Sequence, residues 1–427
     1  MVVRIDPVRE PLRGYVPLPY SKSVSARQIL IGLHSGVSFS VEGLSEADDT
    51  RRLIQIAVDC GYRVVNAGLT WKFEVGDLSL PSHLYVGAGG TTLRFILPWL
   101  VFLPGQTELH LDGRLARRPL LPLLKALSEA GAHIEAAGST LRVRGDPDWR
   151  PCIFRVDARQ SGQFLSAFLL MAPRLEPGSE VIETSGRPAT LSYVERLTCA
   201  ILQKAGYCWE RIGPGHWVLA ARKFLPKDSY AGEADWSGAG YFWGWAMGIS
   251  AQLELPLSLT SEHPERTFWV EGGWPLRVEA DSLALRLTSQ GDLPAAWEGD
   301  IAAVPDAFPT LAVLATLSPK PWIIRGIRTL PYKESDRLSA MQRELSKIGA
   351  TLEWAGDVCR IFPFKNLPRE AVHFYSHVDH RIAMALSLLA TRIRAPLYIH
   401  QAEVVSKSFP AYWEVLRQIG ISLTFEI

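Results

Sequence analysis

Several features that define whole classes of protein are missing from this sequence. Its five cysteines are scattered and no two form a CxxC pair, so neither a disulfide framework nor a cysteine-rich zinc site is expected. No apolar run approaches the length of a membrane-spanning helix, about 18 residues. The N-terminal segment lacks the apolar core of a signal peptide and the Arg and Ser bias of a transit peptide. We therefore expect a soluble, cytoplasmic protein with no membrane partner.

An excess of charge of one sign is also missing. The chain has 45 Lys and Arg against 44 Asp and Glu, whereas proteins that bind nucleic acid generally carry an excess of positive charge. We therefore expect no nucleic-acid partner. Hydrophobic residues make up 47% and charged residues 21%, as in an ordinary folded protein. At roughly 100–200 residues per domain, the 427 residues predict two or more domains.

Fingerprints of common cofactors and metals are absent as well. There is no GxxxxGK[ST] segment, and the glycine-rich GAGGTTLR at 87–94 lacks the spacing of a dinucleotide-binding turn. No HExxH or similar metal-ligand spacing occurs. The sequence therefore predicts chemistry that needs neither a metal nor a cofactor.

A repeat organises the chain instead. Short polar segments each open an apolar helical run, and these runs begin at Ser23, Thr91, Gly162, Ser237, Ala307 and His380. The starts are 68, 71, 75, 70 and 73 residues apart. A fixed period constrains a fold more than any single motif does. We therefore predict six similar modules.

A second, amphipathic helix follows the first in each module. Glycines at the position of a C-cap end these helices at Gly61, Gly131, Gly206, Gly349 and Gly420, and at Gly291 in the irregular fourth module. Runs such as ELHLDG and STLRVRG indicate strands. The first helices are apolar almost all round, which is typical of buried helices, and the second helices carry charge on one face. The prediction is an α/β protein built from α+β modules, with buried helices and outer sheets.

Polar residues gather where the buried helices begin. A helix N-terminus presents unpaired N–H groups and the positive end of the helix dipole, which favour phosphate or carboxylate. The segments are SKSVSAR (21–27), GAGGTTLR (87–94), QSGQ (160–163), DWSG (235–238), PDA (305–307) and DHR (379–381). Each alone could be a simple N-cap, but six together indicate a substrate with more than one anionic group.

The YKESDRL segment at 332–338 adds charged residues. Lys333 and Arg337 are four apart, so on a helix they share a face, where like charges repel unless an anion or a carboxylate lies between them. Glu334 or Asp336 could supply that carboxylate, and a solvated charged face is the alternative. Asp306 and Glu334 are the best acid or base candidates. Asp306 stands at an apolar helix start, where it could accept a proton from a substrate hydroxyl or simply cap the helix.

Ten segments occur in the same order as in one known family. They are PYSKSVSAR, GAGGTTLR, RRPL, VDARQSGQFLSA, TLSY, GEADWSGAGYF, VPDAFPTLAVLA, YKESDRL, VDHRIAMALSLLA and KSFP. On these segments the chain resembles the enolpyruvyl transferases, and within them the EPSP synthase family, over nearly its whole length. The resemblance implies a two-domain inside-out α/β barrel of six modules, three per domain, with a cleft between the domains. The implied domains are 1–19 with 233–427, which is discontinuous, and 20–232.

The resemblance also implies a reaction. The enolpyruvyl group of phosphoenolpyruvate would pass to the 5-hydroxyl of shikimate 3-phosphate through a tetrahedral intermediate, with loss of phosphate, in the shikimate pathway to chorismate and the aromatic amino acids. The two substrates would be the partners of a monomeric enzyme. Asp306 would deprotonate the 5-hydroxyl, and Glu334 with Lys22 would transfer protons at the enol carbon.

Binding roles follow from the same motifs. The resemblance places shikimate 3-phosphate against Lys22, Ser23, Arg27, Ser161, Gly162, Gln163, Thr190, Asp306, Thr329 and Lys333. It places phosphoenolpyruvate against Lys22, Gly90, Arg118, Gln163, Arg337, Arg381 and Lys407. Because Gly90 has no side chain to intrude, we expect inhibition by glyphosate, the family's inhibitor at the phosphoenolpyruvate site.

Five positions depart from the family's usual residues. Tyr20 stands where the family usually has Gly, and Ala88 stands where it has Asn. Gly162 and Thr190 each stand where it has Ser, and Thr329 stands where it often has Asn or Glu. A glycine still presents its N–H and a threonine its hydroxyl, so phosphate binding can survive at 162 and 190. The departures identify a divergent member.

Two other functions compete with this interpretation. An enolpyruvyl transferase for UDP-N-acetylglucosamine would carry Cys or Asp on the loop before its Arg-Pro segment, where this chain has Gly113 to Arg117. A non-catalytic anion-binding paralogue would fit the departures at positions 20, 88 and 162. It would not need to keep both proton-transfer candidates, Asp306 and Glu334.

Overall fold

The computed structural model describes residues 1–221, 227–280, 284–364 and 368–426. The chain forms two compact units. Unit 1 contains Met1–Pro19 and Ala234–Ile427, and unit 2 contains Tyr20–Glu233. Each unit has a hydrophobic core of its own.

Among the described residues, six four-stranded sheets repeat one pattern, in which an edge strand pairs parallel with the second strand and the remaining pairs are antiparallel. The sheets of unit 2 have the orders β14(Ser229–Ala231)-β3(Phe39–Glu42)-β5(Thr70–Val75)-β4(Tyr62–Ala67), β6(His83–Tyr85)-β7(Gln106–His110)-β9(Thr140–Arg144)-β8(His133–Ala137) and β10(Ile153–Val156)-β11(Glu180–Glu183)-β13(His216–Leu219)-β12(Trp209–Gly213). Those of unit 1 have the orders β2(Leu12–Tyr15)-β15(Ser250–Leu255)-β17(Leu285–Gln290)-β16(Arg277–Ala280), β18(Glu298–Asp300)-β19(Trp322–Arg325)-β21(Val358–Phe362)-β20(Thr351–Ala355) and β22(Val372–Tyr375)-β23(Leu397–His400)-β1(Val2–Ile5)-β24(Leu423–Glu426).

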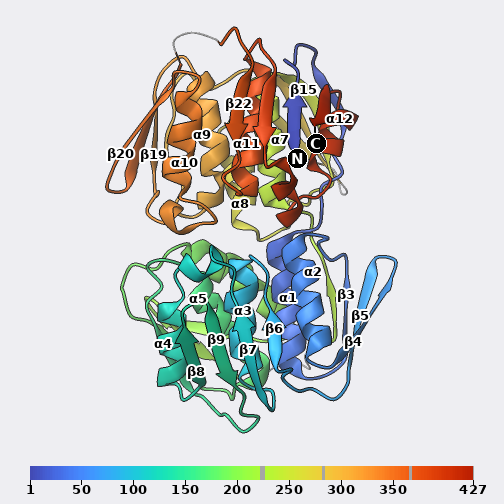
Figure 1. Ribbon diagram of the computed structural model, residues 1–427, viewed down its shortest axis with the longest axis vertical. Coiled ribbons are helices and arrows are strands. Elements are labelled where there is room, and N and C mark those ends of the chain that lie inside the picture. The colour runs from blue at the N-terminus through green and yellow to red at the C-terminus, as the bar shows by residue number, and fades with distance from the viewer. Residues whose placement is uncertain (222–226, 281–283, 365–367, 427) are drawn as a thin grey trace. The chain divides into compact units, whose positions relative to one another are not determined.

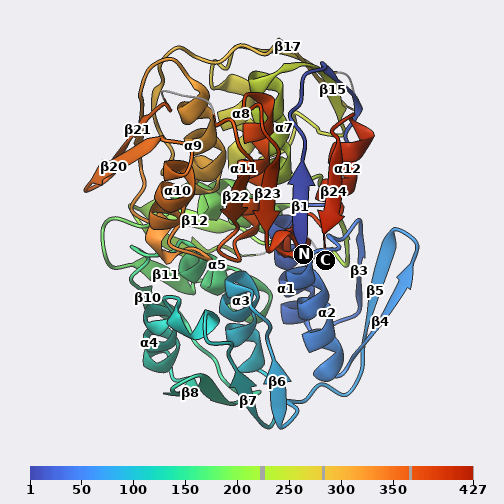
Figure 2. The same ribbon diagram turned by 45° about the horizontal axis from the view of Figure 1, so that its top comes forward.

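The first helix of each module is buried in the core of its unit. These helices are α1(Lys22–Ser35), α3(Gly90–Leu100) and α5(Gln163–Leu169) in unit 2, and α7(Trp236–Gly248), α9(Phe308–Leu317) and α11(His380–Ser387) in unit 1. Every residue of α7 is buried. Helix α3 packs against α1 and α5, and α9 packs against α7 and α11. Figures 1 and 2 show these helices bundled within each unit, with sheets on its outside. The predicted module is thereby confirmed.

The second helices are α2(Asp48–Asp59), α4(Leu121–Glu129), α6(Ala200–Lys204), α8(Pro264–Glu271), α10(Arg337–Ser346) and α12(Tyr412–Gln418). Helix α6 continues a π-helix, η3(Tyr193–Cys199), in which the side-chain hydroxyl of Thr198 donates a hydrogen bond to the Tyr193 carbonyl. Short 3₁₀ helices are η1(Leu115–Arg117), η2(Ala172–Arg174), η4(Pro305–Ala307), η5(Leu330–Tyr332), η6(Leu388–Thr391) and η7(Ala402–Lys407).

The glycines predicted to end the second helices have a positive φ in all five regular modules, with values from 77° at Gly349 to 108° at Gly61. The left-handed conformation is what a C-terminal glycine supplies without steric cost. The prediction for the fourth module was wrong. Gly291 follows strand β17, whereas the second helix there, α8, ends at Glu271 before Gly272 and Gly273.

The α/β fold class is confirmed, with one qualification. The strands in the described part of the chain form six separate sheets, and none of them closes into a barrel. Within the same residues, no helix has the length and apolar character to cross a membrane.

Candidate functional site

A cluster of cations surrounds the carboxylate of Asp306 in unit 1. Oδ1 lies 2.8 Å from Nη1 of Arg337 and 3.2 Å from Nζ of Lys333, while Oδ2 lies 2.9 Å from Nη2 of Arg381. These side chains come from η4, the start of α10, the end of η5 and the start of α11. The repeat therefore brings two predicted helix starts, at 305–307 and 379–381, to one place in unit 1.

Arg337 is held between two carboxylates. Besides Asp306, it donates from Nε to Asp379 at 2.8 Å and from Nη2 at 3.3 Å. Asp379 is fully buried and also caps α11 by accepting from the Arg381 backbone N–H. Burial alone would lower the pKa of Arg337, but the two carboxylates raise it above its ordinary value. Arg337 is thus a fixed cation.

The charges around Asp306 set its protonation state. Burial would raise its pKa, but Arg381, Lys333 and Arg337 outweigh burial and hold the pKa well below 3.8. Burial lowers the pKa of Lys333, and Arg337 and Arg381 act in the same direction against the attraction of Asp306. Asp306 is therefore an ionised carboxylate near neutral pH, surrounded by three cations that could bind an anionic substrate.

Glu334 stands in a second contact group of the same unit. Its Oε2 lies 3.0 Å from Nδ1 of His380 and 3.5 Å from Nζ of Lys407, and Lys407 also donates to the Val378 carbonyl at 3.3 Å. Glu334, His380 and Lys407 are mostly buried. A carboxylate beside an imidazole and an ammonium group is suited to proton transfer.

Two interpretations of the YKESDRL segment were wrong. Helix α10 begins at Arg337, so Lys333 precedes the helix and the two cations do not share a helix face. Asp306 lies between them, in place of Glu334 or Asp336, and Asp336 caps α10 instead. The N-cap alternative for Asp306 was wrong too, since Ala307 is the N-cap of α9 and no side chain caps it.

Thr329 lies at the start of η5 in the same unit. Its Oγ1 is buried, with no hydrogen-bond partner among the described residues. A buried hydroxyl without a partner is costly unless a ligand or water satisfies it.

In unit 2, Lys22 is paired with a carboxylate. It is the first residue of α1, which Ser21 caps, and its Nζ lies 3.0 Å from Oδ2 of Asp49 on α2. Both side chains are mostly buried. The pair places a cation, already bound to a carboxylate, at the start of a buried helix.

Gln163 is oriented by two neighbours. Arg94 donates to its Oε1 at 2.8 Å, and its Nε2 donates to Oγ1 of Thr91 at 2.8 Å. Arg94 also donates to the Pro119 carbonyl, and more weakly to Ser161 at 3.4 Å. Burial, and then Arg118, lower the pKa of Arg94 to about 9. The starts of α3 and α5 thus share one polar network.

Arg118 approaches the backbone of Gly90. A Cβ at position 90 would lie 2.5 Å from Nη1 of Arg118 and 2.6 Å from its Cζ. The Nε of Arg118 is buried without a hydrogen-bond partner among the described residues. Because glycine at 90 has no Cβ, the Arg118 guanidinium can lie against the backbone there.

Two departures from the family pattern, Gly162 and Thr190, lie next to each other. A Cβ at 162 would lie 2.5 Å from the Ala189 carbonyl oxygen and 2.7 Å from Oγ1 of Thr190. Thr190 has φ 49°, a conformation that β-branched residues rarely adopt. A side chain at 162 would therefore meet the Ala189 carbonyl and the Thr190 hydroxyl, so the structure leaves little room at 162 for any residue but glycine.

Tyr20 is accommodated in a similar way. Its ring packs where side chains at Gly43 and Gly232 would otherwise lie. Nothing in the structure explains Ala88.

Arg27 has partners inside unit 2. It is 3% exposed and donates to Oγ1 of Thr198 at 2.8 Å and to the Ser23 carbonyl at 2.9 Å. Burial lowers its pKa to about 10. Its role therefore includes tying α1 to η3.

At the start of α7 the N-cap alternative is confirmed. The carboxylate of Asp235 accepts from the backbone N–H groups of Ser237 and Gly238, and Ser237 donates to Glu265 at 2.8 Å. These carboxylates occupy the helix start and would repel an anion.

Sequence reasoning placed Arg94, Asp379 and His380 only within the polar segments at 87–94 and 379–381, without an individual role, and assigned no role to Asp49. The available signal was a charged residue next to or within an apolar helical run, as in TTLRFILPWL and VDHRIAMALSLLA. Such a residue must be paired when it is buried.

Comparison with known proteins decides the family. A profile described as EPSP synthase (3-phosphoshikimate 1-carboxyvinyltransferase) matches residues 8–416. The chain belongs to the EPSP synthase family. It is 31% identical to a 3-phosphoshikimate 1-carboxyvinyltransferase of Pseudomonas syringae pv. tomato over 98% of each chain. It is 30% identical to one of Laribacter hongkongensis over 96% of this chain and 97% of that protein.

Solved structures share the fold. An EPSP synthase from Acinetobacter baumannii superposes with a TM-score of 0.78 at 24% identity, covering 99% of this chain and 100% of the other. The enolpyruvyl transferase NikO from Streptomyces tendae gives 0.77 at 16% identity, covering 99% and 98%. The resemblance drawn from the ten sequence segments, and the enolpyruvyl transferase fold it implied, are confirmed.

Proposed function

We propose that the protein transfers the enolpyruvyl group of phosphoenolpyruvate to the 5-hydroxyl of shikimate 3-phosphate and releases phosphate. Membership of the EPSP synthase family across residues 8–416 supports this reaction. The observation that carries the proposal is the Asp306 cluster, where one ionised carboxylate meets Lys333, Arg337 and Arg381. Both substrates are anions that repel each other in water, and fixed cations offset that repulsion.

The residues of unit 1 divide into two roles in this proposal. Arg337, Arg381 and Lys407 bind phosphoenolpyruvate, and Lys333 and Thr329 bind shikimate 3-phosphate. Asp306 accepts the proton of the 5-hydroxyl. Its low pKa makes it a weak base while three cations contact it. Substrate anions that engage those cations would raise the pKa and make Asp306 a stronger base.

Glu334 is the proposed proton donor and acceptor at the enol carbon, together with Lys22 of unit 2. Its contacts with His380 and Lys407 offer a route by which a proton can be replenished.

The residues of unit 2 bind the two substrates in the same proposal. Shikimate 3-phosphate contacts Lys22, Ser23, Arg27, Ser161, Gly162, Gln163 and Thr190. Phosphoenolpyruvate contacts Lys22, Gly90, Arg118 and Gln163. The buried, unpartnered Nε of Arg118 supports a ligand there, and the two anchors on Gln163 support its role as a bridge between the substrates. The two units are the proposed catalytic domains, and a cytoplasmic monomer stays a prediction.

Phosphate release tests the proposed function. Purified protein with phosphoenolpyruvate is expected to release phosphate when shikimate 3-phosphate is added, and not when UDP-N-acetylglucosamine is added. The Lys22→Met variant, which keeps the side-chain length without the charge, should release phosphate far more slowly. Release with the sugar nucleotide would identify the rival transferase. If neither acceptor gave release while calorimetry detected shikimate 3-phosphate binding, the protein would be a binding paralogue.

Replacing Gly90 by alanine is expected to raise the KM for phosphoenolpyruvate by about 10- to 100-fold, because the added Cβ would displace Arg118 and a shift of about 1 Å can cost that much. The same change should weaken inhibition by glyphosate, which we expect to compete with phosphoenolpyruvate in the unaltered protein. Steady-state kinetics provide the measurement. Gly113→Ala is the matched control, since a Cβ there meets nothing within 4 Å. An unchanged KM in Gly90→Ala, or no inhibition by millimolar glyphosate, would contradict these expectations.

A further inference from the structure

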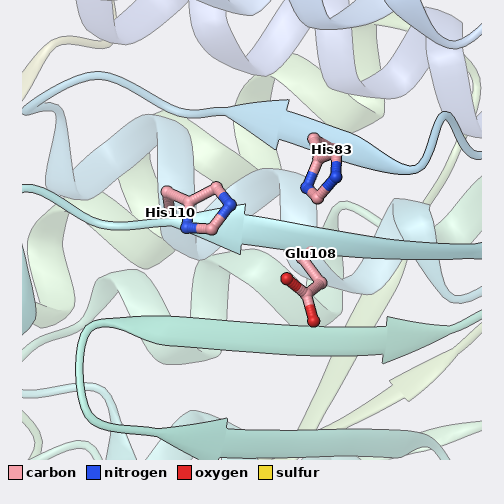
Figure 3. Close-up of side chains that lie close together, drawn as sticks. All are labelled: His83, Glu108 and His110. Atoms are coloured by element: carbon pink, nitrogen blue, oxygen red, sulfur yellow. The ribbon is translucent and has the colours of Figure 1, made fainter.

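Two histidines and a glutamate lie together on the outer face of the β6-β7 sheet in unit 2. His83 on β6 is directly opposite Glu108 on β7, and His110 lies two residues further along β7. Residues two apart on a strand point to the same face, and the burial of β7 alternates accordingly, with Thr107 and Leu109 inside. Figure 3 shows the three side chains close together. None of them belongs to the clusters assigned to the proposed reaction.

The donor atoms of this His83-Glu108-His110 cluster are close enough to share one ion. One ligand atom from each residue can be chosen so that all lie within 4.8 Å of one another. The two imidazole rings are nearly parallel, with centroids 5.6 Å apart. Both histidines are exposed and Glu108 is partly buried, so an ion could enter from solvent without rearrangement of the strands.

Glu108 is already oriented by a neighbour. Arg142 on β9, opposite Glu108 in the sheet, donates from Nε to Oε1 at 2.7 Å. That hydrogen bond fixes the carboxylate and uses one of its two oxygens. Metal-ligating carboxylates are commonly held by such outer hydrogen bonds, and Oε2 can serve as the ligand.

We propose that His83, Glu108 and His110 bind a divalent transition-metal ion of the zinc type. Two imidazoles and one carboxylate are ligands that zinc accepts, and three protein ligands leave a further position for water. Exposed strands hold the ligands more rigidly than a loop would. The ion would join edge strand β6 to β7 through side chains, and because it binds the folded chain it would raise the stability of unit 2.

The repeat supplies an internal comparison in unit 1. On the equivalent strands β22 and β23, His373 occupies the place of His83 and His400 that of His110, but Tyr398 occupies the place of Glu108. Nδ1 of His373 lies 2.9 Å from Nε2 of His400, and the Tyr398 ring stacks on His373. The ammonium group of Lys347 donates to the His373 carbonyl. This pair lacks the carboxylate, so it should bind zinc far more weakly.

Zinc titration of the full-length protein tests the proposal. After treatment with a chelator and its removal, calorimetry with zinc chloride should give one saturable site per chain, and the thermal unfolding temperature should rise with zinc. Glu108→Gln, His83→Ala and His110→Ala should each weaken zinc binding by at least about tenfold, since even loss of a residue that only orients a ligand costs about 10- to 100-fold. His400→Ala should leave zinc affinity unchanged.

Two further measurements serve as controls. The first distinguishes zinc bound at this cluster from zinc bound at cysteines, and the second distinguishes weakened binding from misfolding of the variants. X-ray absorption of the zinc-loaded protein should show nitrogen and oxygen neighbours at about 2.0–2.2 Å and no sulfur. The metal-free variants should release phosphate at the same rate as the unaltered protein, and equal rates would show that the variants fold. No saturable zinc binding, binding that persists in all three variants, or binding that is lost in His400→Ala would overturn the proposal.

Discussion

Asp306→Asn is expected to lower kcat for phosphate release by about 10²- to 10⁴-fold, the range that a general base contributes. The amide keeps the size of the side chain but cannot accept the hydroxyl proton. It also leaves Lys333, Arg337 and Arg381 without their shared carboxylate, so substrate anions should bind at least as tightly. The expected result is therefore a loss in kcat with little increase in either KM, measured by steady-state kinetics with both substrates varied.

Asp336→Asn is the matched control for this prediction. Asp336 belongs to the same YKESDRL segment, but its carboxylate caps α10 by accepting from the Leu338 and Ser339 backbone N–H groups. Asparagine is also a good N-cap, so kcat should change little. If Asp306→Asn retained most of its activity, or lost no more than Asp336→Asn, Asp306 would not be the proton acceptor.

Arg337→Met is expected to destabilise the protein by about 3–5 kcal/mol, the cost of leaving a buried charge without its partner. Asp379 is 0% exposed and receives two hydrogen bonds from Arg337. Urea unfolding followed by tryptophan fluorescence measures the change in free energy of unfolding. The double variant Arg337→Met with Asp379→Asn should be less destabilised than Arg337→Met alone, because it removes the unpaired charge. A single variant as stable as the unaltered protein would contradict the account of this pair.

The difference in free energy of unfolding between the unaltered protein and Arg337→Met should also depend on pH. Burial would raise the pKa of Asp379, but Arg337 holds it below its ordinary value in the folded protein. A depressed pKa contributes stability that is present above the unfolded pKa, about 3.9, and is lost as the pH falls through the folded pKa. In Arg337→Met, burial without a cation raises the pKa of Asp379, and protonation relieves the unpaired charge. The stability difference between the two proteins should therefore be largest near neutral pH and shrink on acidification.

Periodicity and helix ends were predictable from sequence because they depend on neighbours in the chain. The starts of α1, α3, α5, α7, α9 and α11 fall within one residue of the predicted positions. The helix-ending glycines were identified for the same reason, since a left-handed C-terminal residue is a local requirement. The prediction that a helix ends at Gly291 was wrong because a glycine after a strand looks the same in sequence as a glycine after a helix.

The partners of the charged residues were not predictable, because they depend on how segments far apart in the chain pack against one another. Asp306 and Arg337 are 31 positions apart and Arg337 and Asp379 are 42 apart. Spacing suggested a carboxylate within the YKESDRL segment, but the one between Lys333 and Arg337 comes from η4, just before the first helix of the same module. Likewise, only the structure shows that the carboxylates of Asp235 and Asp379 occupy the N-termini of α7 and α11.

Phosphorus-31 NMR of one reaction mixture tests the central claim most directly, because it follows phosphoenolpyruvate, shikimate 3-phosphate and inorganic phosphate together. The account predicts that phosphate appears in equal amount to the phosphoenolpyruvate consumed, while the phosphorus of the acceptor stays esterified and moves to a new chemical shift. Phosphate that arises from shikimate 3-phosphate, or phosphoenolpyruvate that is hydrolysed equally without an acceptor, would contradict enolpyruvyl transfer by this chain.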